Sequence, residues 1–213
     1  MTTRLHYFDI YGRGESIRLL LAHAKVDYED VIVTREQLPE LKASGLAEFG
    51  QVPVLERNGK TYVQSWSILR TLGAELGYYP TTDAELAYQV DSSIEAVEDF
   101  IPKYFRPIFE QDETKKAALI EDLVANVPRF AGLVNARLER NEDKLHLVGT
   151  TTTIADIALA TVAFSFIQNP AGPFAERLAA VTKAGEHPLV DAYFQNLATE
   201  LAPRLTTRGP RPF

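Results

Sequence analysis

The chain has 213 residues, 46% of them hydrophobic and 24% charged, which is the composition of a globular protein with one large or two small domains. Its 22 Lys and Arg against 29 Asp and Glu give a net charge of −7, which argues against nucleic acid or an anionic membrane surface as partners. It contains no cysteine and no apolar run long enough to span a membrane, so disulfides, thiolate metal sites and a cysteine nucleophile are excluded and a cytoplasmic location is expected.

Strand-like and helix-like patterns alternate over the first 76 residues, whereas the rest of the chain is helical in pattern almost throughout. The expected elements are strands at 4–8, 28–33, 52–56 and 60–63 and helices at 15–25, 38–44 and 65–76. Asn58-Gly59, between the last two strands, is a strong signal for a tight hairpin. The order β-α-β-α-β-β-α predicts an α/β domain whose first crossover connection is right-handed.

A turn-rich stretch at 77–83 has no apolar periodicity and separates the two patterns. We therefore expect an α/β domain at 1–80 and an all-helical domain at 81–213. The second domain should begin with two long helices, at 85–110 and 115–140, broken or bent near their internal prolines.

The run at 157–167 is apolar on nearly every side, which predicts a helix at the centre of the helical core. Thr153 and Asp156 have the spacing of an N-terminal capping box for this helix, with Asp in place of the usual Glu. That spacing explains Asp156 better than a role as a catalytic acid does.

Neither a metal nor a nucleotide site is indicated by the motifs. The four histidines, at positions 6, 23, 146 and 187, lack the spacing of metal ligands. Gly12-Arg13-Gly14 follows a strand but lacks the rest of either glycine-rich phosphate-binding fingerprint. These glycines are better explained by a tight turn that enters a helix at Glu15 or Ser16.

Polar residues stand where strands end and helices start. Tyr7 lies near the C-terminal end of the first strand, at the edge where open α/β sheets place ligands, although its pattern also fits a core aromatic residue. Gln51 precedes Val52-Pro53, whose backbone groups are free to pair with an extended peptide. The Gln64-Ser65 pair starts a helix, where Ser65 can cap the helix or bind a carboxylate.

Together these features resemble, in order and spacing, the cytosolic glutathione transferases. The segments that carry the resemblance are 5–8 (LHYF), 12–18 (GRGESIR), 51–55 (QVPVL), 64–70 (QSWSILR), 97–99 (VED), 147–149 (LVG), 153–156 (TIAD) and 187–189 (HPL). They cover nearly the whole chain. The early Tyr and the Gln-Ser pair are most similar to the tyrosine-type classes, with sigma or pi nearest, and imply a thioredoxin-like first domain followed by a helical one.

The resemblance implies a glutathione site with no metal or resident cofactor, in which glutathione is a co-substrate. Tyr7 matches the tyrosine that donates a hydrogen bond to the glutathione sulfur, and Tyr11 and Ser16 are its nearest rivals. The other implied glutathione-binding residues are Arg13, Lys42, Gln51, Val52, Pro53 in the cis form, Gln64, Ser65 and, reaching glutathione in the neighbouring subunit, Asp99. Leu38 stands where the family often has a tryptophan, so a hydrogen bond to the glycyl end of glutathione is lost or made elsewhere.

The electrophile side is implied to be an apolar cleft between the domains, lined by Phe8, Ile10, Phe105 and Phe109. Phe49 stands where an aromatic residue of the family inserts into a partner subunit, which implies a homodimer. Trp66 is expected to serve packing rather than ligand contact.

The expected function is conjugation of the glutathione thiolate to hydrophobic electrophiles, as in detoxification. One alternative is a glutathione-dependent isomerase similar to the sigma-type prostaglandin D synthases, which would return glutathione unchanged. Another is a non-enzymatic ligand carrier or crystallin-like protein, although such a protein has no need of Tyr7, Gln64 and Ser65.

Overall fold

The computed structural model describes residues 2–182 and 185–213. Its first part contains a mixed four-stranded sheet with the strand order β2-β1-β3-β4. The strands are β1 (Thr3–Tyr7), β2 (Glu29–Ile32), β3 (Val54–Arg57) and β4 (Lys60–Val63). β1 runs parallel to β2 and antiparallel to β3, and β3 and β4 form the antiparallel hairpin that Asn58-Gly59 predicts.

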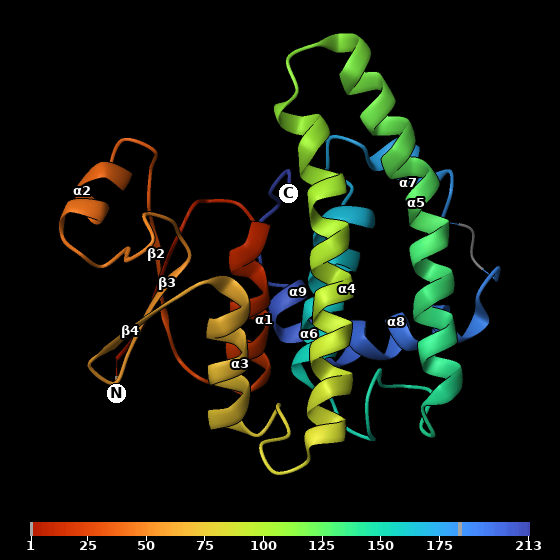
Figure 1. The fold of residues 1–213 in the computed structure, drawn as a ribbon, viewed down its shortest axis with the longest axis horizontal. Coiled ribbons are helices and arrows are strands. Elements are labelled where there is room, and N and C mark those ends of the chain that lie inside the picture. The colour runs from red at the N-terminus through yellow and green to blue at the C-terminus, as the bar shows by residue number, and fades with distance from the viewer. Residues whose placement is uncertain (1, 183–184) are drawn as a thin grey trace.

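Three helices cover this sheet on its two faces: α1 (Glu15–His23), α2 (Leu38–Ala43) and α3 (Ser65–Leu76). Figure 1 shows α2 on the outer side of the sheet and α1 with α3 on the side that faces the rest of the molecule. A 3₁₀ turn, Gly12–Gly14, leads directly into α1. The loop after β1 is thereby held between the sheet and the helical part, so Tyr7 stands at the junction of the two.

The second part is helical in the residues that the structure describes. It comprises α4 (Ala84–Phe109), α5 (Glu113–Arg140), α6 (Ile154–Val162), a π-helical turn (Ala163–Ile167), α7 (Ala175–Ala179), α8 (Pro188–Glu200) and α9 (Ala202–Leu205). The two long helices are not broken: α4 continues through Pro102 and Pro107, and α5 through Pro128. Each proline removes one backbone hydrogen bond, and the packing of α4 against α5 and α6 holds the helix together around that loss.

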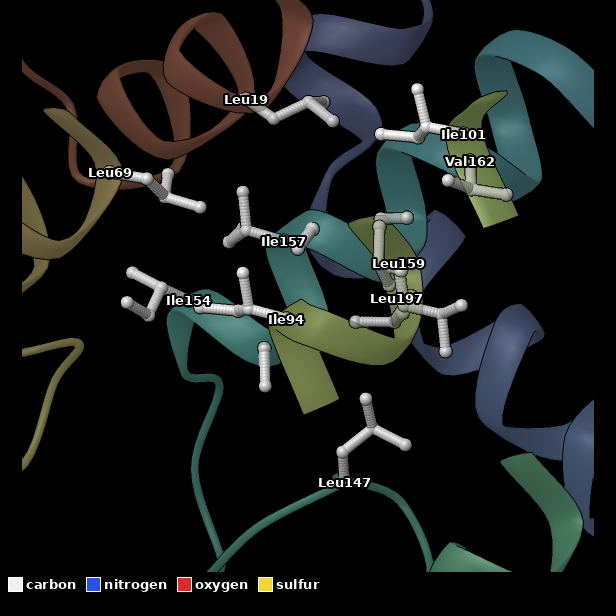
Figure 2. Packing of buried hydrophobic residues seen from close by; sticks show 14 of the residues in the cluster. Leu19, Leu69, Ile94, Ile101, Leu147, Ile154, Ile157, Leu159, Val162 and Leu197 are labelled. Carbon is white, nitrogen blue, oxygen red and sulfur yellow. The ribbon is translucent and has the colours of Figure 1, made fainter. Parts of the chain in front are cut away.

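Helix α6 lies at the centre of the core, and every one of its residues is buried. Figure 2 shows Ile157 of α6 facing Leu19 of α1 and Leu69 of α3, with side chains of α4 and α8 packed around it. The α/β part and the helical part therefore share one continuous core. This shared core keeps the residues at their junction in a fixed relation.

The predicted capping box at the start of α6 is confirmed. Thr153 is the N-cap, its hydroxyl accepts a hydrogen bond from the Ala155 amide, and the Asp156 carboxylate accepts one from the Thr153 amide at 2.8 Å. Asp156 also accepts hydrogen bonds from the Leu147 amide and the Tyr193 hydroxyl, both at 2.9 Å. All of these contacts are structural, so Asp156 serves the core.

These observations confirm the predicted fold class of an α/β part followed by a helical part. The boundary near residue 80 stays a prediction; α3 ends at Leu76 and α4 begins at Ala84. Among the helices of the described residues, none is both long and apolar enough to cross a membrane.

Candidate active site

Tyr7 is the last residue of β1, and only 6% of its surface is exposed. Its hydroxyl accepts a hydrogen bond from the Arg13 amide at 2.9 Å, and in the part of the chain that the structure describes no hydrogen bond uses the hydroxyl's own proton. Burial raises the pKa of Tyr7, against the opposing effects of the Arg13 amide and the nearby Arg18 and Arg13 charges. The phenol is therefore neutral at pH 7 and has a proton to donate.

Gly12 and Gly14 make room for this ring. A Cβ atom at Gly12 would stand 2.5 Å from the Tyr7 hydroxyl oxygen, and one at Gly14 would stand 2.5 Å from the Tyr7 ring. Gly12 also has a φ of +45°, which disfavours a side chain there. The glycines thus do more than shorten the turn, because they let the backbone close over Tyr7.

A polar cavity of about 330 Å³ opens beside this turn. Its lining comes from the 3₁₀ turn, the loop before β3, the end of β4, the start of α3 and the middle of α4. The lining residues are Arg13, Phe49, Gln51, Val52, Pro53, Val63, Gln64, Ser65 and Glu98. Its volume is within the usual range for small-molecule sites. Segments far apart in the sequence thus place six of the predicted glutathione-binding residues around one space.

Arg13 is held in this cavity by a residue that the sequence reasoning missed. Its guanidinium forms a two-pronged ion pair with Glu98, at 2.5 and 2.8 Å. The same carboxylate accepts a hydrogen bond from the Trp66 indole at 2.7 Å, while the Trp66 ring packs against the core. Burial favours the neutral acid, but the bonds from Arg13 and Trp66 prevail and hold the pKa of Glu98 below its usual value.

The start of α3 borders the cavity at Gln64 and Ser65. Gln64 is the N-cap of α3 but makes no side-chain capping bond, and Ser65 is the buried first residue of the helix. The first N–H groups of a helix lack partners within it, and with the helix dipole they favour an anion. Gln64 has a φ of +70°, a conformation that costs a non-glycine residue about 1–3 kcal/mol and is found most often at functional sites.

The Val52-Pro53 peptide bond is cis, as predicted. Val52 precedes β3, so its N–H and C=O groups lie outside the ladder of the sheet and border the cavity.

Three of the nine predicted glutathione-binding residues are not among those that line the cavity: Tyr7, Lys42 and Asp99. Lys42 lies exposed at the end of α2, with its side chain beside Gly50, and Asp99 is exposed on α4 next to Glu98. The structure thus brings six of the predicted residues together around the cavity, places the buried Tyr7 hydroxyl against the Arg13 amide, and leaves Lys42 and Asp99 apart.

The four predicted electrophile-binding residues lie on two elements. Phe8 packs against Tyr7, with ring centroids 5.7 Å apart, and the Ile10 side chain lies by Gly12, as does the Tyr7 hydroxyl. Phe105 and the exposed Phe109 stack at the end of α4, 6.5 Å apart. Phe213, the last residue of the chain, joins them with its ring 5.8 Å from that of Phe105.

The two rival residues for Tyr7 are occupied elsewhere. The Tyr11 hydroxyl donates to the Gly209 carbonyl at 2.8 Å, and the fully buried Ser16 hydroxyl faces the Arg13 carbonyl at 3.3 Å. Of the three hydroxyls, that of Tyr7 is the one with a proton not already donated within the described residues. For metals, the described residues contain no group of three or more His, Cys, Asp or Glu arranged to hold an ion.

Both halves of the chain match models of one family. Residues 3–72 match the glutathione S-transferase N-terminal domain, and residues 98–200 match the glutathione S-transferase C-terminal domain. Glutathione S-transferase A of Cavia porcellus is 35% identical over 165 residues, which are 75% of this chain and 73% of that protein.

Solved structures agree over the whole length. A monomeric glutathione S-transferase of Necator americanus superposes with a TM-score of 0.82 at 26% identity and covers 100% of both chains. Prostaglandin synthase D of Nilaparvata lugens gives a TM-score of 0.79 at 25% identity, over 98% of this chain and 99% of that one. The chain therefore belongs to the glutathione S-transferase family and is a glutathione transferase.

Proposed function

We propose that Tyr7 activates glutathione by donating a hydrogen bond to its sulfur, and that the thiolate attacks hydrophobic electrophiles held beside Ile10 and Phe105. The observation that supports this most is the buried, neutral Tyr7 hydroxyl, whose proton is undonated within the described residues, at the turn that lines the polar cavity.

The energy required is within reach of one such bond. A thiol with a pKa of about 8.5 is about 3% ionised at pH 7, and lowering that pKa by about two units makes roughly three quarters of it thiolate. The shift requires about 2.7 kcal/mol, and a hydrogen bond to a charged acceptor supplies about 1.5–3 kcal/mol. Tyr7 therefore needs no help from a separate base, because the thiol proton leaves to solvent.

Glutathione would lie extended in the polar cavity. The γ-glutamyl carboxylate is proposed to bind the amides at the start of α3 and the Ser65 hydroxyl, with Gln64 beside its ammonium group. The Val52 backbone would pair with the cysteinyl unit, next to Gln51 and Pro53.

The remaining assignments place charged side chains at the ends of the tripeptide. Lys42 would face the glycyl carboxylate, although this side chain has to turn from its position by Gly50. Asp99 would reach the γ-glutamyl ammonium group bound to a partner subunit. Arg13 would organise the site through its ion pair with Glu98. Beyond glutathione as co-substrate, no cofactor is proposed.

In the reaction, the sulfur forms a bond to an electrophilic carbon of the second substrate. With a chloronitroarene, the C–Cl bond breaks and chloride leaves, so the product is a thioether. Phe8 and Phe109 complete the apolar surroundings in this proposal. Catalysis then rests on thiolate formation and on holding the two reactants together.

The test is the rate of glutathione conjugation to a chloronitroarene by the wild type and by Tyr7→Phe. Loss of the hydrogen bond should return the thiol pKa to about 8.5 and lower the rate at pH 7 about 25-fold, with glutathione binding little changed. Tyr28→Phe, which alters another partly buried phenol away from the cavity, is the matched control and should keep the wild-type rate. An unchanged rate in Tyr7→Phe would contradict the assignment.

A homodimer is proposed from two apolar features that face outward. Phe49 is 61% exposed at the rim of the polar cavity. A second cavity, of about 260 Å³, opens between α4 and α5 and is lined largely by apolar residues, including Val97, Phe130 and the exposed Leu133. Phe49 of one subunit would insert into this cavity of the other, which buries both surfaces through an isologous contact.

Phe49→Ser should then shift the protein from dimer to monomer in sedimentation experiments, and Leu133→Asp should do the same from the receiving side. Ile32→Ser, at another exposed apolar residue, should leave the dimer intact. A monomeric wild type, as in the Necator americanus relative, would overturn this part of the proposal.

The isomerase alternative is separated from transfer by the products. A stable thioether indicates transfer, whereas a rearranged substrate with glutathione recovered indicates isomerisation. The likeness to prostaglandin synthase D is no stronger than the likeness to the transferases, so transfer is the better supported function. The detoxification role and the cytoplasmic location stay predictions from the sequence.

A further inference from the structure

Glu15, the first residue of α1, is a carboxylate with 0% of its surface exposed. It is surrounded by three arginines. Arg204 of α9 donates hydrogen bonds to both carboxylate oxygens of Glu15, at 3.1 and 3.0 Å. Arg208 donates to one of these oxygens at 3.1 Å, and Arg18 lies 3.4 Å from the carboxylate. A buried charge is costly unless it is paired and hydrogen-bonded, so this cluster holds its members in defined places.

Two of these arginines fix segments at the electrophile side. Arg18 pairs with Asp30 at 2.9 Å and donates to the Ile10 carbonyl, also at 2.9 Å, which holds the loop after β1. Arg208 donates to the Phe164 carbonyl at 2.7 Å, and its guanidinium lies 4.2 Å from the centre of the Tyr11 ring. Glu15 thus links the loop and the end of the chain through one carboxylate.

The chain beyond Arg208 continues along the same loop. The Tyr11 hydroxyl donates to the Gly209 carbonyl and the Tyr11 amide to the Phe213 carbonyl, at 2.8 and 2.7 Å. Arg211 forms an ion pair with Asp9 at 2.7 Å. Figure 1 shows the C-terminus beside the N-terminal end of α1. The Phe213 ring is thereby held against Phe105, on the side where electrophiles are proposed to bind.

We propose that Glu15 is a positioning residue for the electrophile side: through Arg204 and Arg208 it anchors residues 208–213 on the loop after β1 and so sets the selectivity among electrophiles. This inference rests on the proposed placement of the electrophile beside Ile10 and Phe105. Glutathione binding should be independent of Glu15, because the polar cavity is lined by other residues.

The experiment compares Glu15→Gln and Arg208→Gln with Arg57→Gln. Arg57 is a matched control because it is also a buried arginine with a two-pronged carboxylate partner, Glu75, but it belongs to the β3–β4 hairpin. KM and kcat are measured for glutathione, for a small chloronitroarene and for a two-ring unsaturated ketone. Amide hydrogen exchange of the peptide that contains Tyr11 is measured in parallel.

Both test variants should speed amide exchange at Tyr11. They should also raise the KM for the chloronitroarene about two- to tenfold, which corresponds to the free energy of one lost aromatic contact. The KM for glutathione should stay within about twofold of wild type. The ratio of kcat/KM between the two electrophiles should change in both, and in Arg57→Gln it should not. Equal effects on both electrophiles and on glutathione, or the same change of ratio in Arg57→Gln, would overturn the proposal.

If Glu15→Gln does not fold, Arg208→Gln tests the proposal by itself. Arg208 lies beyond α9, and its substitution leaves Glu15 paired with Arg204. Faster exchange at Tyr11 with an unchanged electrophile ratio would also overturn the proposal. Failure of the proposed function gives a different result. The wild type would then form no thioether, whereas amide exchange at Tyr11 would still show whether residues 208–213 are held on the loop after β1.

Discussion

Asp156 offers a test of how strongly one buried carboxylate holds the core. Its two oxygens accept four hydrogen bonds: from the Leu147 amide and the Tyr193 hydroxyl on one side, and from the Thr153 amide and hydroxyl on the other. In Asp156→Asn, one of these oxygens becomes an NH2 group. Because hydroxyls can rotate to accept but backbone amides cannot, either the Leu147 or the Thr153 amide then faces a donor.

The cost follows from this count. One buried amide without an acceptor costs about 1–3 kcal/mol, and the loss of the charge weakens the bonds that remain. We expect Asp156→Asn to lower the free energy of unfolding by about 2–4 kcal/mol, a large share of the roughly 5–15 kcal/mol that stabilises a typical domain.

Urea unfolding, followed by the fluorescence of the single Trp66, measures this loss. The comparison is made at one protein concentration, because subunit association would otherwise change the apparent stability. Asp83→Asn is the matched control: Asp83 is the exposed N-cap of α4, accepting from the Glu85 and Leu86 amides at 3.0 Å, and Asn caps helices about as well as Asp. The reasoning is refuted if Asp156→Asn costs less than about 1 kcal/mol or no more than the control.

Three further predictions concern the polar cavity and its turn. Gln64→Gly relieves the positive φ and should raise the free energy of unfolding by about 1 kcal/mol while glutathione affinity falls, as thermal unfolding and titration calorimetry would measure. Because the pKa of Glu98 is lowered on folding, its ionisation stabilises the protein above the ordinary carboxyl pKa of about 4.3 and that contribution is lost as pH falls through the lowered value. The stability difference between wild type and Glu98→Gln should therefore be present at pH 7 and shrink below about pH 4, in urea unfolding at both pH values. Gly14→Ala should abolish conjugation and destabilise the protein, since its Cβ would stand 2.5 Å from the Tyr7 ring, whereas Gly132→Ala in α5, with no contact closer than 4.0 Å, should keep activity and gain about 0.5–1 kcal/mol.

Local patterns were sufficient to predict the order of the elements. The hairpin at Asn58-Gly59, the helix that starts at Ser65 and the capping box at Thr153 and Asp156 each depend on residues that are neighbours in the sequence. These features are encoded over a few residues and are therefore readable without the fold. The cis bond at Pro53 was predicted in another way, from the family resemblance.

The contacts that connect distant segments were not predictable in this way. Glu98 meets both Arg13 and Trp66 only because α3 and α4 are brought beside the turn before α1. A glutamate at the start of a helix reads as an exposed residue. No pattern in the neighbouring sequence indicates that Glu15 pairs with Arg204 of α9 and with Arg208 near the chain end. Phe213 follows prolines in a tail without periodicity, so its position against Phe105 depends on the whole fold. Charged pairs and chain ends are placed by tertiary packing, which a periodic pattern does not record.

In the proposed function, the short stretch from Gly12 to Arg18 serves both substrates. Arg13 pairs with Glu98 on the polar side, Glu15 faces the arginines that anchor the chain end, and the Tyr7 hydroxyl lies against Gly12 of the same turn. The two proposed binding sides therefore depend on different ion clusters, which the backbone of this turn joins. Substitutions at Glu98 should act on glutathione and those at Glu15 on the electrophile, whereas a side chain at Gly12 or Gly14 should disturb both, because it displaces the Tyr7 hydroxyl, where we propose that the two substrates meet.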